Sequence, residues 1–229
     1  QTMHRHLIVS FITLLAFVTA GCKPVAVEEA VQTATALKVE APSGQYRHDP
    51  THASLQFGVL HLGLSNYVAG FTEYSMELDL DSDNISASSV SITIDPNSIR
   101  TDYRGDYVAS HADSGFANWE EDLAMSEKFF NAALYPEIRF QSTEISEQSS
   151  GRLQVNGELT LLGQTHPVTL EAIVVGSTSK HPFTQTPALG LSVSGTFLRS
   201  TFGMDYLVAP GFVGDQVTLM FEGELHQAL

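Results

Sequence analysis

The side chains best suited to acid-base chemistry lie in one short run, Trp119-Glu120-Glu121-Asp122. Three neighbouring carboxylates beside an indole are the strongest candidates for general acid-base catalysis in this chain. The sequence contains no Gly-x-Ser-x-Gly nucleophile motif, no phosphate-binding loop and no dinucleotide-binding glycine pattern to accompany them. We therefore predict that the protein is not an enzyme and assign no catalytic residue.

Metal-binding patterns are weak. The run DLDSDN, from Asp79 to Asn84, begins like a calcium loop, but Asn84 replaces the required glycine and Val90 stands where the final glutamate belongs. The nine histidines are scattered, and the only cysteine, Cys22, lies near the N-terminus. We predict no metal site and no catalytic cofactor.

Two polar residues interrupt apolar faces and are candidates for ligand contact. In LGLSVSGTFLRS, residues 189–200, apolar residues alternate, and Arg199 falls on their face. A buried guanidinium needs a partner, so Arg199 either forms an ion pair with a residue such as Asp205 or Asp49, or contacts a ligand head group. His61 is similarly either a hydrogen-bonded core histidine or a polar contact inside a cavity.

The elements that would position these residues are strands. From Tyr46 onward, apolar residues recur with a period of two in about eight runs separated by turn residues. This pattern predicts an all-β fold, an antiparallel barrel or sandwich, and we expect an extended eight-stranded barrel.

Three glycines, Gly157, Gly195 and Gly223, occupy apolar positions of their strands. They either relieve strain at bends of the barrel or leave room on its inner face. We favour the second interpretation, which predicts an enclosed cavity for a long apolar molecule. The predicted lining is Phe57, Val59, His61, Tyr74, Met76, Leu78, Ile92, Phe140, Val155, Gly157, Leu159, Leu170, Val193, Gly195, Phe197, Leu219 and Phe221.

The segment between Ile99 and Pro136 does not read as strand. GFANWEEDLAMSEKFFNAALYP predicts one or two short helices that cover the barrel, either as a packed plug of structural aromatics or as a lid. Trp119 and Phe129, together with Arg199, are the candidates for the cavity mouth or for head-group contact.

The N-terminal residues predict export. An apolar run too short to span a bilayer, Leu7 to Ala20, follows His4-Arg5-His6. Small residues then precede Cys22 and resemble a bacterial lipobox, although cleavage after Ala20 would also fit. We expect a signal peptide over residues 1–21, a lipidated Cys22 with a tether over 22–44, and a barrel domain over 45–229.

The net charge limits the choice of partner. The chain has 229 residues and a formal net charge of -15, which repels phosphate backbones and argues against nucleic acid. The predicted partners are a long-chain apolar lipid and a membrane reached through the N-terminal anchor, and a homodimer is compatible with the sequence.

Four motifs in register resemble the YceI-like, polyisoprenoid-binding family from Tyr46 to the end of the chain. They are YRHDPTHASLQFGVLHLGLSNYVAGFTEY, FFNAALYPEIRFQST, VNGELTLLGQTHPVTLEA and FLRSTFGMD. The resemblance implies a lipocalin-like barrel with a helical insertion, periplasmic or extracellular, that binds a long isoprenoid or another amphipathic lipid such as a quinone. The region of Trp119 to Leu123 departs from the family pattern, so the head group is not predicted.

Two functions of different classes follow. The first is a periplasmic carrier or store of a polyisoprenoid, isoprenoid quinone or similar lipid, anchored as a lipoprotein to a bacterial membrane, the outer membrane by default. The alternative is an envelope hydrolase or a structural, stress-related module with a packed barrel and its function on the acidic insertion. An open lumen would favour the first.

Overall fold

The computed structural model describes residues 38–148 and 151–228, and the predicted signal peptide and Cys22 lie outside them. Most of the described chain is strand, as the alternating pattern predicts. The strands are β1 (Gly44–His61), β2 (Ser65–Phe71), β3 (Tyr74–Leu80), β4 (Ser89–Ile94), β5 (Ile99–Arg100), β6 (Ile138–Glu147), β7 (Arg152–Leu161), β8 (Gln164–Thr178), β9 (Ala188–Leu198) and β10 (Val213–Gln227). The short helices are α1 (Tyr107–Ser110), α2 (Trp119–Met125) and 3-10 turns at Ile85–Ala87, Pro96–Ser98 and Arg199–Phe202.

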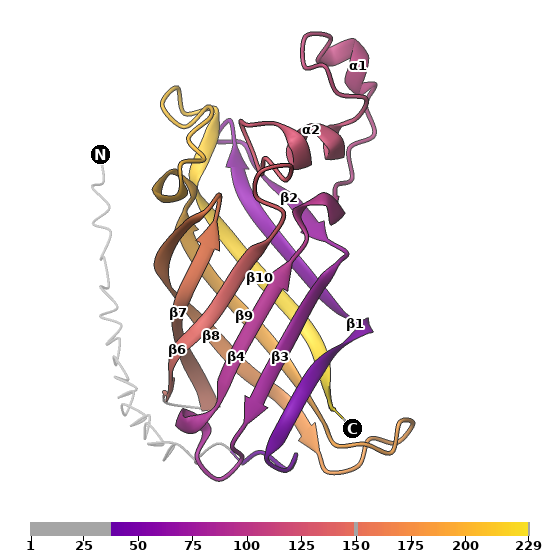
Figure 1. Ribbon diagram of the computed structural model, residues 1–229, viewed down its shortest axis with the longest axis vertical. Coiled ribbons are helices and arrows are strands. Elements are labelled where there is room, and N and C mark those ends of the chain that lie inside the picture. The colour runs from indigo at the N-terminus through magenta and orange to yellow at the C-terminus, as the bar shows by residue number, and fades with distance from the viewer. Residues whose placement is uncertain (1–37, 149–150, 229) are drawn as a thin grey trace, which may run out of the picture. The chain divides into compact units, whose positions relative to one another are not determined.

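Eight strands close an antiparallel barrel (Figure 1). Around the ring the order is β10, β9, β8, β7, β6, β4, β3 and β1. Strand β1 closes the ring by pairing with β10 from Tyr46↔Gln227 to His61↔Val213. Each of the eight strands therefore pairs with a neighbour on both sides over part of its length. The predicted eight-stranded barrel with a short helical insertion is confirmed.

Strand β1 has two different partners on its other side. Its first residues, Gly44 to Arg47, pair with β3, whereas Leu55 to His61 pair with β2. Between these blocks the register of β1 with β10 shifts, and the His48 Nδ1 atom accepts a hydrogen bond from the backbone N–H of Met76 at 3.1 Å. In this bulge Pro50, Thr51 and His52 are exposed, and Asp49 is partly buried.

The two ends of the barrel differ. The end that carries α1 and α2, called here the helix end, is covered by the insertion between β5 and β6 (Figure 1). Helix α2 begins where the Asn118 side chain accepts from the Glu121 N–H at 2.8 Å, and its first turn is acidic, as a helix N-terminus prefers. The opposite end, called the terminal end, carries the start of β1 and the end of β10.

At the terminal end, the last residues of the predicted tether pack on the barrel. Ala41 is 1% exposed, and the Glu40 N–H donates to Ser177 Oγ at 2.7 Å. The Tyr46 hydroxyl, itself buried, donates to the carbonyl of Pro42 at 2.6 Å. Residues 40–42 of the predicted tether therefore contact the barrel.

Candidate ligand-binding cavity

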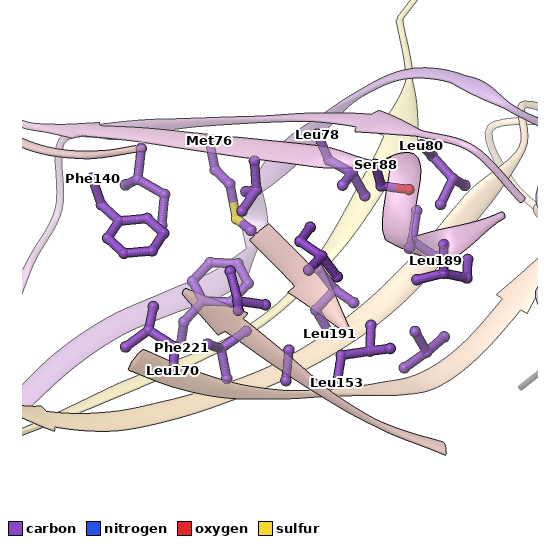
Figure 2. Close-up of a pocket in the computed structure, with 18 of the residues that line it drawn as sticks. Met76, Leu78, Leu80, Ser88, Phe140, Leu153, Leu170, Leu189, Leu191 and Phe221 are labelled. Carbon is purple, nitrogen blue, oxygen red and sulfur yellow. The ribbon is translucent and has the colours of Figure 1, made fainter. Parts of the chain in front are cut away.

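A cavity of about 90 Å³ runs inside the barrel from its middle toward the terminal end. Figure 2 shows side chains from opposite walls, such as Met76, Leu153 and Phe221, pointing into it. Its lining is Val39, Leu55, Met76, Leu78, Leu80, Ile85, Ser88, Val90, Ile92, Phe140, Ile145, Leu153, Val155, Leu170, Ala172, Val174, Leu189, Leu191, Val193, Leu219, Met220 and Phe221. All are apolar except Ser88.

The cavity offers no acid-base chemistry. None of its lining residues has a titratable side chain, and Ser88 Oγ is already used as an acceptor by the Asp81 N–H at 2.9 Å. A long apolar chain would meet only carbon and sulfur here, apart from that hydroxyl. The arrangement can therefore bind by burial of apolar surface, and the Ser88 hydroxyl is the one polar side-chain group in its wall.

Nine residues of the predicted lining are found in the cavity wall: Met76, Leu78, Ile92, Phe140, Val155, Leu170, Val193, Leu219 and Phe221. Sequence reasoning missed the part of the wall nearest the terminal end, including Val39, Leu80, Ile85, Ser88 and Leu189. The alternation that identifies inward positions extends to Leu80 and Leu189, but Val39, Ile85 and Ser88 lie outside strands and carry no periodic signal.

The remaining aromatic and aliphatic predictions lie elsewhere. Phe57 packs against Phe71 and Phe130 with ring centroids 5.7 and 6.1 Å apart, and Phe197 packs edge-on to Phe202. Tyr74 stacks on His48 at 4.7 Å. Leu159 is a buried core residue and Val59 is half-buried, and neither belongs to the cavity wall.

His61 is exposed at the end of β1, on the helix end of the barrel. Both interpretations of this residue are therefore wrong, because it is neither a core histidine nor a cavity contact. The pairing of β1 with β2 is unbroken from Leu55 to His61, and the shift against β10 adds residues on β10. His61 is exposed because it is the last residue of β1, at the end of the barrel.

The three glycines do not leave room for a ligand on the inner face of the barrel. The prediction that the cavity arises from these glycines is therefore wrong. A Cβ on Gly157 would lie 2.4 Å from Phe140 Cζ, one on Gly195 would lie 2.4 Å from Leu170 Cδ2, and one on Gly223 would lie 2.7 Å from Ala53 Cβ. Neighbouring strands fill the space with their own side chains. The cavity lies where the lining residues leave space between them, and none of the three glycines lines it.

Arg199 is 4% exposed and fully engaged by the main chain. Its Nε donates to the carbonyl of Gly214 at 2.8 Å, and its terminal nitrogens donate to Met204, Tyr206 and Val213 at 2.9 to 3.1 Å. Burial lowers the pKa of Arg199, and nearby carboxylates partly oppose this shift. The predicted ion pair with Asp205 or Asp49 is therefore wrong. The role of Arg199 is nevertheless structural, because its side chain holds the main-chain carbonyls that follow the end of β9.

The insertion at the helix end packs as an aromatic plug. Trp119 Nε1 donates to the Tyr67 hydroxyl at 2.7 Å, and Trp119 and Phe129 meet edge to face at 5.4 Å. Phe129 in turn meets Tyr206 at 5.6 Å. Burial raises the pKa of Tyr67. These contacts favour the plug over the lid, and they place Trp119 and Phe129 at the end opposite to the cavity.

The carboxylates of the insertion are structural. Glu120 accepts from the backbone N–H of Thr101, Glu121 accepts from the Ala117 N–H, and buried Asp122 accepts from the Tyr107 hydroxyl. Burial, followed by the bond to Asp122, raises the pKa of Tyr107. Their oxygens therefore fix the insertion, and none of them borders the cavity.

The residues with structural description include no helix long and apolar enough to cross a membrane.

Comparisons with known proteins agree with the barrel. The YceI-like domain matches residues 46–225 of the chain. A UPF0312 protein of Shewanella denitrificans is 32% identical over 172 residues, which cover 75% of this chain and 82% of that protein. A UPF0312 protein of Vibrio parahaemolyticus is 34% identical over 146 residues, or 63% of this chain and 70% of that protein.

Two solved structures are similar in fold. BcnA of Burkholderia cenocepacia gives a TM-score of 0.61 at 18% identity, over 79% of this chain and 99% of that chain. The YCEI protein of Campylobacter jejuni gives a TM-score of 0.58 at 23% identity, over 74% of this chain and 90% of that chain. At such identities the likeness concerns the fold alone.

Proposed function

Because the chain belongs to the YceI-like domain family, we propose that it is a lipid-binding protein rather than an enzyme, and that its barrel holds one long apolar chain. A polyisoprenoid, an isoprenoid quinone or a similar amphipathic lipid fits this description, and the protein would carry or store it. The observation that carries the proposal is the cavity itself, whose wall is apolar except for Ser88.

The volume of the cavity means that a long chain can enter only if side chains of the wall move apart. A volume of about 90 Å³ is well below the roughly 300–1,000 Å³ of pockets that enclose compact drug-sized molecules. A single hydrocarbon chain is narrow enough to enter between facing side chains, and the unbranched Met76 can change rotamer to lengthen the path. The ligand therefore enters as a chain, with its head group outside the apolar wall.

The terminal end is the side from which the chain would enter. Val39, Ile85 and Ser88 line the cavity there, and the helix end is filled by the plug around Trp119. Ser88 carries the only hydroxyl in the wall. A polar head group would thus remain near the segment of residues 38–43, which crosses the terminal end.

We also propose that the protein acts in the periplasm, held at a membrane by lipidated Cys22, with the outer membrane as the default. The apolar run before Cys22 and the small residues Thr19, Ala20 and Gly21 support this placement. An anchored barrel of this kind would exchange a lipid with the adjacent bilayer over a short distance. A packed envelope module without ligand is the alternative.

The first test is mass spectrometry of lipid extracted from the purified protein. A prenyl or other long-chain lipid in roughly equal molar amount is expected. Affinity is then measured with prenols of increasing chain length that compete with a fluorescent fatty acid. Tighter binding with each added prenyl unit, up to the length of the cavity, is expected because each buried CH₂ contributes about 0.8 kcal/mol.

The matched variants lie on one strand. Ala172→Phe places a ring inside the cavity, whereas Val175→Phe adds the same ring at a residue that is 69% exposed. We expect Ala172→Phe to lose affinity at least about tenfold, which corresponds to about 1.4 kcal/mol of binding free energy. Val175→Phe should bind the lipid as the unmodified protein does. A folded Ala172→Phe variant with unchanged affinity would place the ligand elsewhere.

A further inference from the structure

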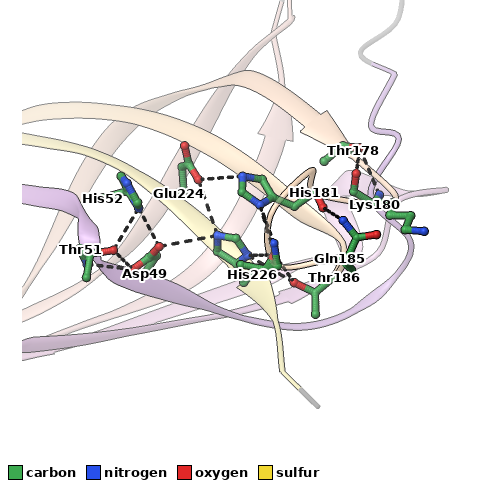
Figure 3. A network of polar contacts seen from close by, with 11 residues as sticks. Asp49, Thr51, His52, Thr178, Lys180, His181, Gln185, Thr186, Glu224 and His226 are labelled. Atoms are coloured by element: carbon green, nitrogen blue, oxygen red, sulfur yellow. Dashed lines mark hydrogen bonds and ion pairs between the residues drawn. The ribbon is translucent and has the colours of Figure 1, made fainter.

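Two histidines and a glutamate meet on the outer surface of the barrel at its terminal end (Figure 3). Glu224 and His226 are alternate residues of β10, and Leu225 between them points into the core with 0% exposure. His181 comes from the loop between β8 and β9. We call His181, Glu224 and His226 the histidine cluster.

The ligand atoms of the histidine cluster are close enough for one metal ion. Glu224 Oε2 lies 3.6 Å from His226 Nε2 and 3.7 Å from His181 Nε2, and all three atoms lie within 4.8 Å of one another. In a tetrahedral zinc site with bonds of about 2.0–2.1 Å, ligand atoms are roughly 3.3 Å apart. Small side-chain rotations close this difference.

The His226 ring presents a buried nitrogen to the cluster without a partner. Its Nε2 atom is inaccessible to solvent and makes no hydrogen bond. Its Nδ1 atom lies 3.2 Å from Thr184 Oγ1 and 3.4 Å from Thr186 Oγ1, hydroxyl oxygens that can accept the ring N–H. In that tautomer Nε2 carries a free lone pair and lies within 4.8 Å of the ligand atoms of Glu224 and His181, as in a metal-binding histidine held by its other nitrogen.

A fourth candidate ligand atom, an oxygen of Asp49, lies beside the cluster. Asp49 Oδ2, on the bulge of β1, is 3.8 Å from His226 Nε2. The same oxygen accepts a hydrogen bond from His52 Nδ1 at 2.9 Å. The other carboxylate oxygen of Asp49 accepts from the backbone and the hydroxyl of Thr51. The aspartate is thus oriented toward the cluster by its neighbours.

The loop that carries His181 is held in place. The His181 N–H donates to the carbonyl of Thr186 at 2.8 Å, and the Gln185 N–H donates to the carbonyl of His181 at 2.9 Å. The His181 ring meets the His226 ring edge-on at 5.0 Å. Both imidazoles are mostly buried, with side chains 20% and 17% exposed, whereas Glu224 is 43% exposed and leaves a route for an ion.

We propose that the histidine cluster binds a divalent transition metal ion, with zinc best suited to it, and that Asp49 lies beside the ion as a second carboxylate. Imidazole nitrogen with carboxylate oxygen is a donor set that suits zinc, whereas calcium and magnesium prefer oxygen ligands alone. Two carboxylates balance the charge of the ion. The bound metal would join the β8–β9 loop, β10 and the bulge of β1, and its role is to stabilise the terminal end.

The test compares the whole protein with three variants after removal of metal by a chelator. Zinc uptake is measured by elemental analysis after dialysis against micromolar ZnCl₂, and affinity by competition with a chelating dye. Glu224→Gln keeps the shape of an exposed side chain, and His226→Ala removes the buried ligand. His61→Ala, an exposed histidine on the helix end, is the matched control.

We expect Glu224→Gln and His226→Ala to hold one zinc ion fewer per chain than the unmodified protein, and His61→Ala to hold the same number. Because the readout is a difference between proteins, zinc bound by other histidines does not affect it. Loss of folding in His226→Ala leaves Glu224→Gln as the deciding variant. Equal zinc content in the unmodified protein and Glu224→Gln would overturn the proposal in favour of a metal-free polar cluster.

A second readout follows the stability of the fold. Binding to the native state alone raises stability in proportion to the logarithm of zinc concentration above Kd. The melting temperature of the unmodified protein and of His61→Ala should therefore rise with added ZnCl₂, and that of Glu224→Gln should rise less. Magnesium chloride should leave all three unchanged. A zinc-induced rise of equal size in Glu224→Gln would contradict the assignment.

Discussion

Replacing Gly157 by alanine tests whether the space beside the inward glycines of the barrel is empty or is filled by neighbouring strands. The added Cβ would lie 2.4 Å from Phe140 Cζ and 2.5 Å from the carbonyl oxygen of Gln141. The ring of Phe140 is held in the core at 6% exposure, and the carbonyl belongs to the neighbouring strand β6. The carbonyl cannot move without disturbing the barrel wall, and the ring can yield only toward the cavity that it lines.

The expected cost follows from these contacts. Overpacking of a filled core by one methyl group costs typically about 1–3 kcal/mol. In a domain of this size, each kcal/mol lowers the melting temperature by roughly 2–4 °C. Gly157→Ala should therefore lower the melting temperature by about 2–12 °C. Without the clash, the same change would stabilise by about 0.4–1 kcal/mol through the unfolded chain.

Gly190→Ala on β9 is the matched control. Its Cβ would meet only Val175 Cβ, at an ordinary distance of 3.7 Å. Unfolding of both variants is followed by circular dichroism against temperature and urea, and we expect Gly190→Ala to equal or slightly exceed the unmodified protein in stability. The double variant Phe140→Leu with Gly157→Ala should be more stable than the two single changes predict, by about 0.5 kcal/mol or more.

If Gly157→Ala were as stable as Gly190→Ala, the inner face at Gly157 would have room for a side chain. The contact between Phe140 and Gly157 would then not fill the barrel, and the lumen would extend past the cavity wall described above. That result would refute the assignment of a filled inner face and would restore the glycines as part of a wider ligand path.

Three further changes have defined outcomes. Arg199→Met should lower the free energy of unfolding by about 2–4 kcal/mol, because buried carbonyls lose their donor, and should leave the extracted lipid unchanged; an unaltered urea midpoint with lost lipid would instead assign Arg199 to the ligand. Trp119→Phe should cost about 0.5–1.5 kcal/mol through the lost bond to Tyr67, measured by thermal unfolding, and no loss would mean that the plug is held by packing alone. Cys22→Ser should abolish labelling by radioactive palmitate, and retained label would remove the lipoprotein proposal.

The strands of the barrel were predictable because one rule covers them. Inward residues such as Met76, Leu170 and Phe221 repeat every second position, and a buried face demands that period. The rule does not tell where the barrel ends. His61 continues the alternation of β1, but it is the last residue of that strand and is exposed.

The cavity was predictable only in part, because empty space depends on how neighbouring strands pack. Gly195 reads as a gap in its own strand, but the Leu170 side chain of β8 occupies that gap. Sequence spacing likewise cannot reveal the partners of Arg199, which are main-chain carbonyls with no side-chain signature. The histidine cluster was missed for a similar reason, since His181 reaches Glu224 and His226 only through the β8–β9 loop.

The pairing of the first and last strands makes the barrel dependent on its complete length. Tyr46 and Gln227 are neighbours in the ring although almost the whole described chain separates them. Such contacts give a high contact order. The chain therefore loses the entropy of closing a long loop before the contacts between β1 and β10 stabilise the fold. A chain lacking β10 leaves β1 and β9 as open edges, which are templates for aggregation. Removing the fifteen residues of β10, Val213–Gln227, therefore destroys the closed barrel as a whole, and the loss is not limited to one strand.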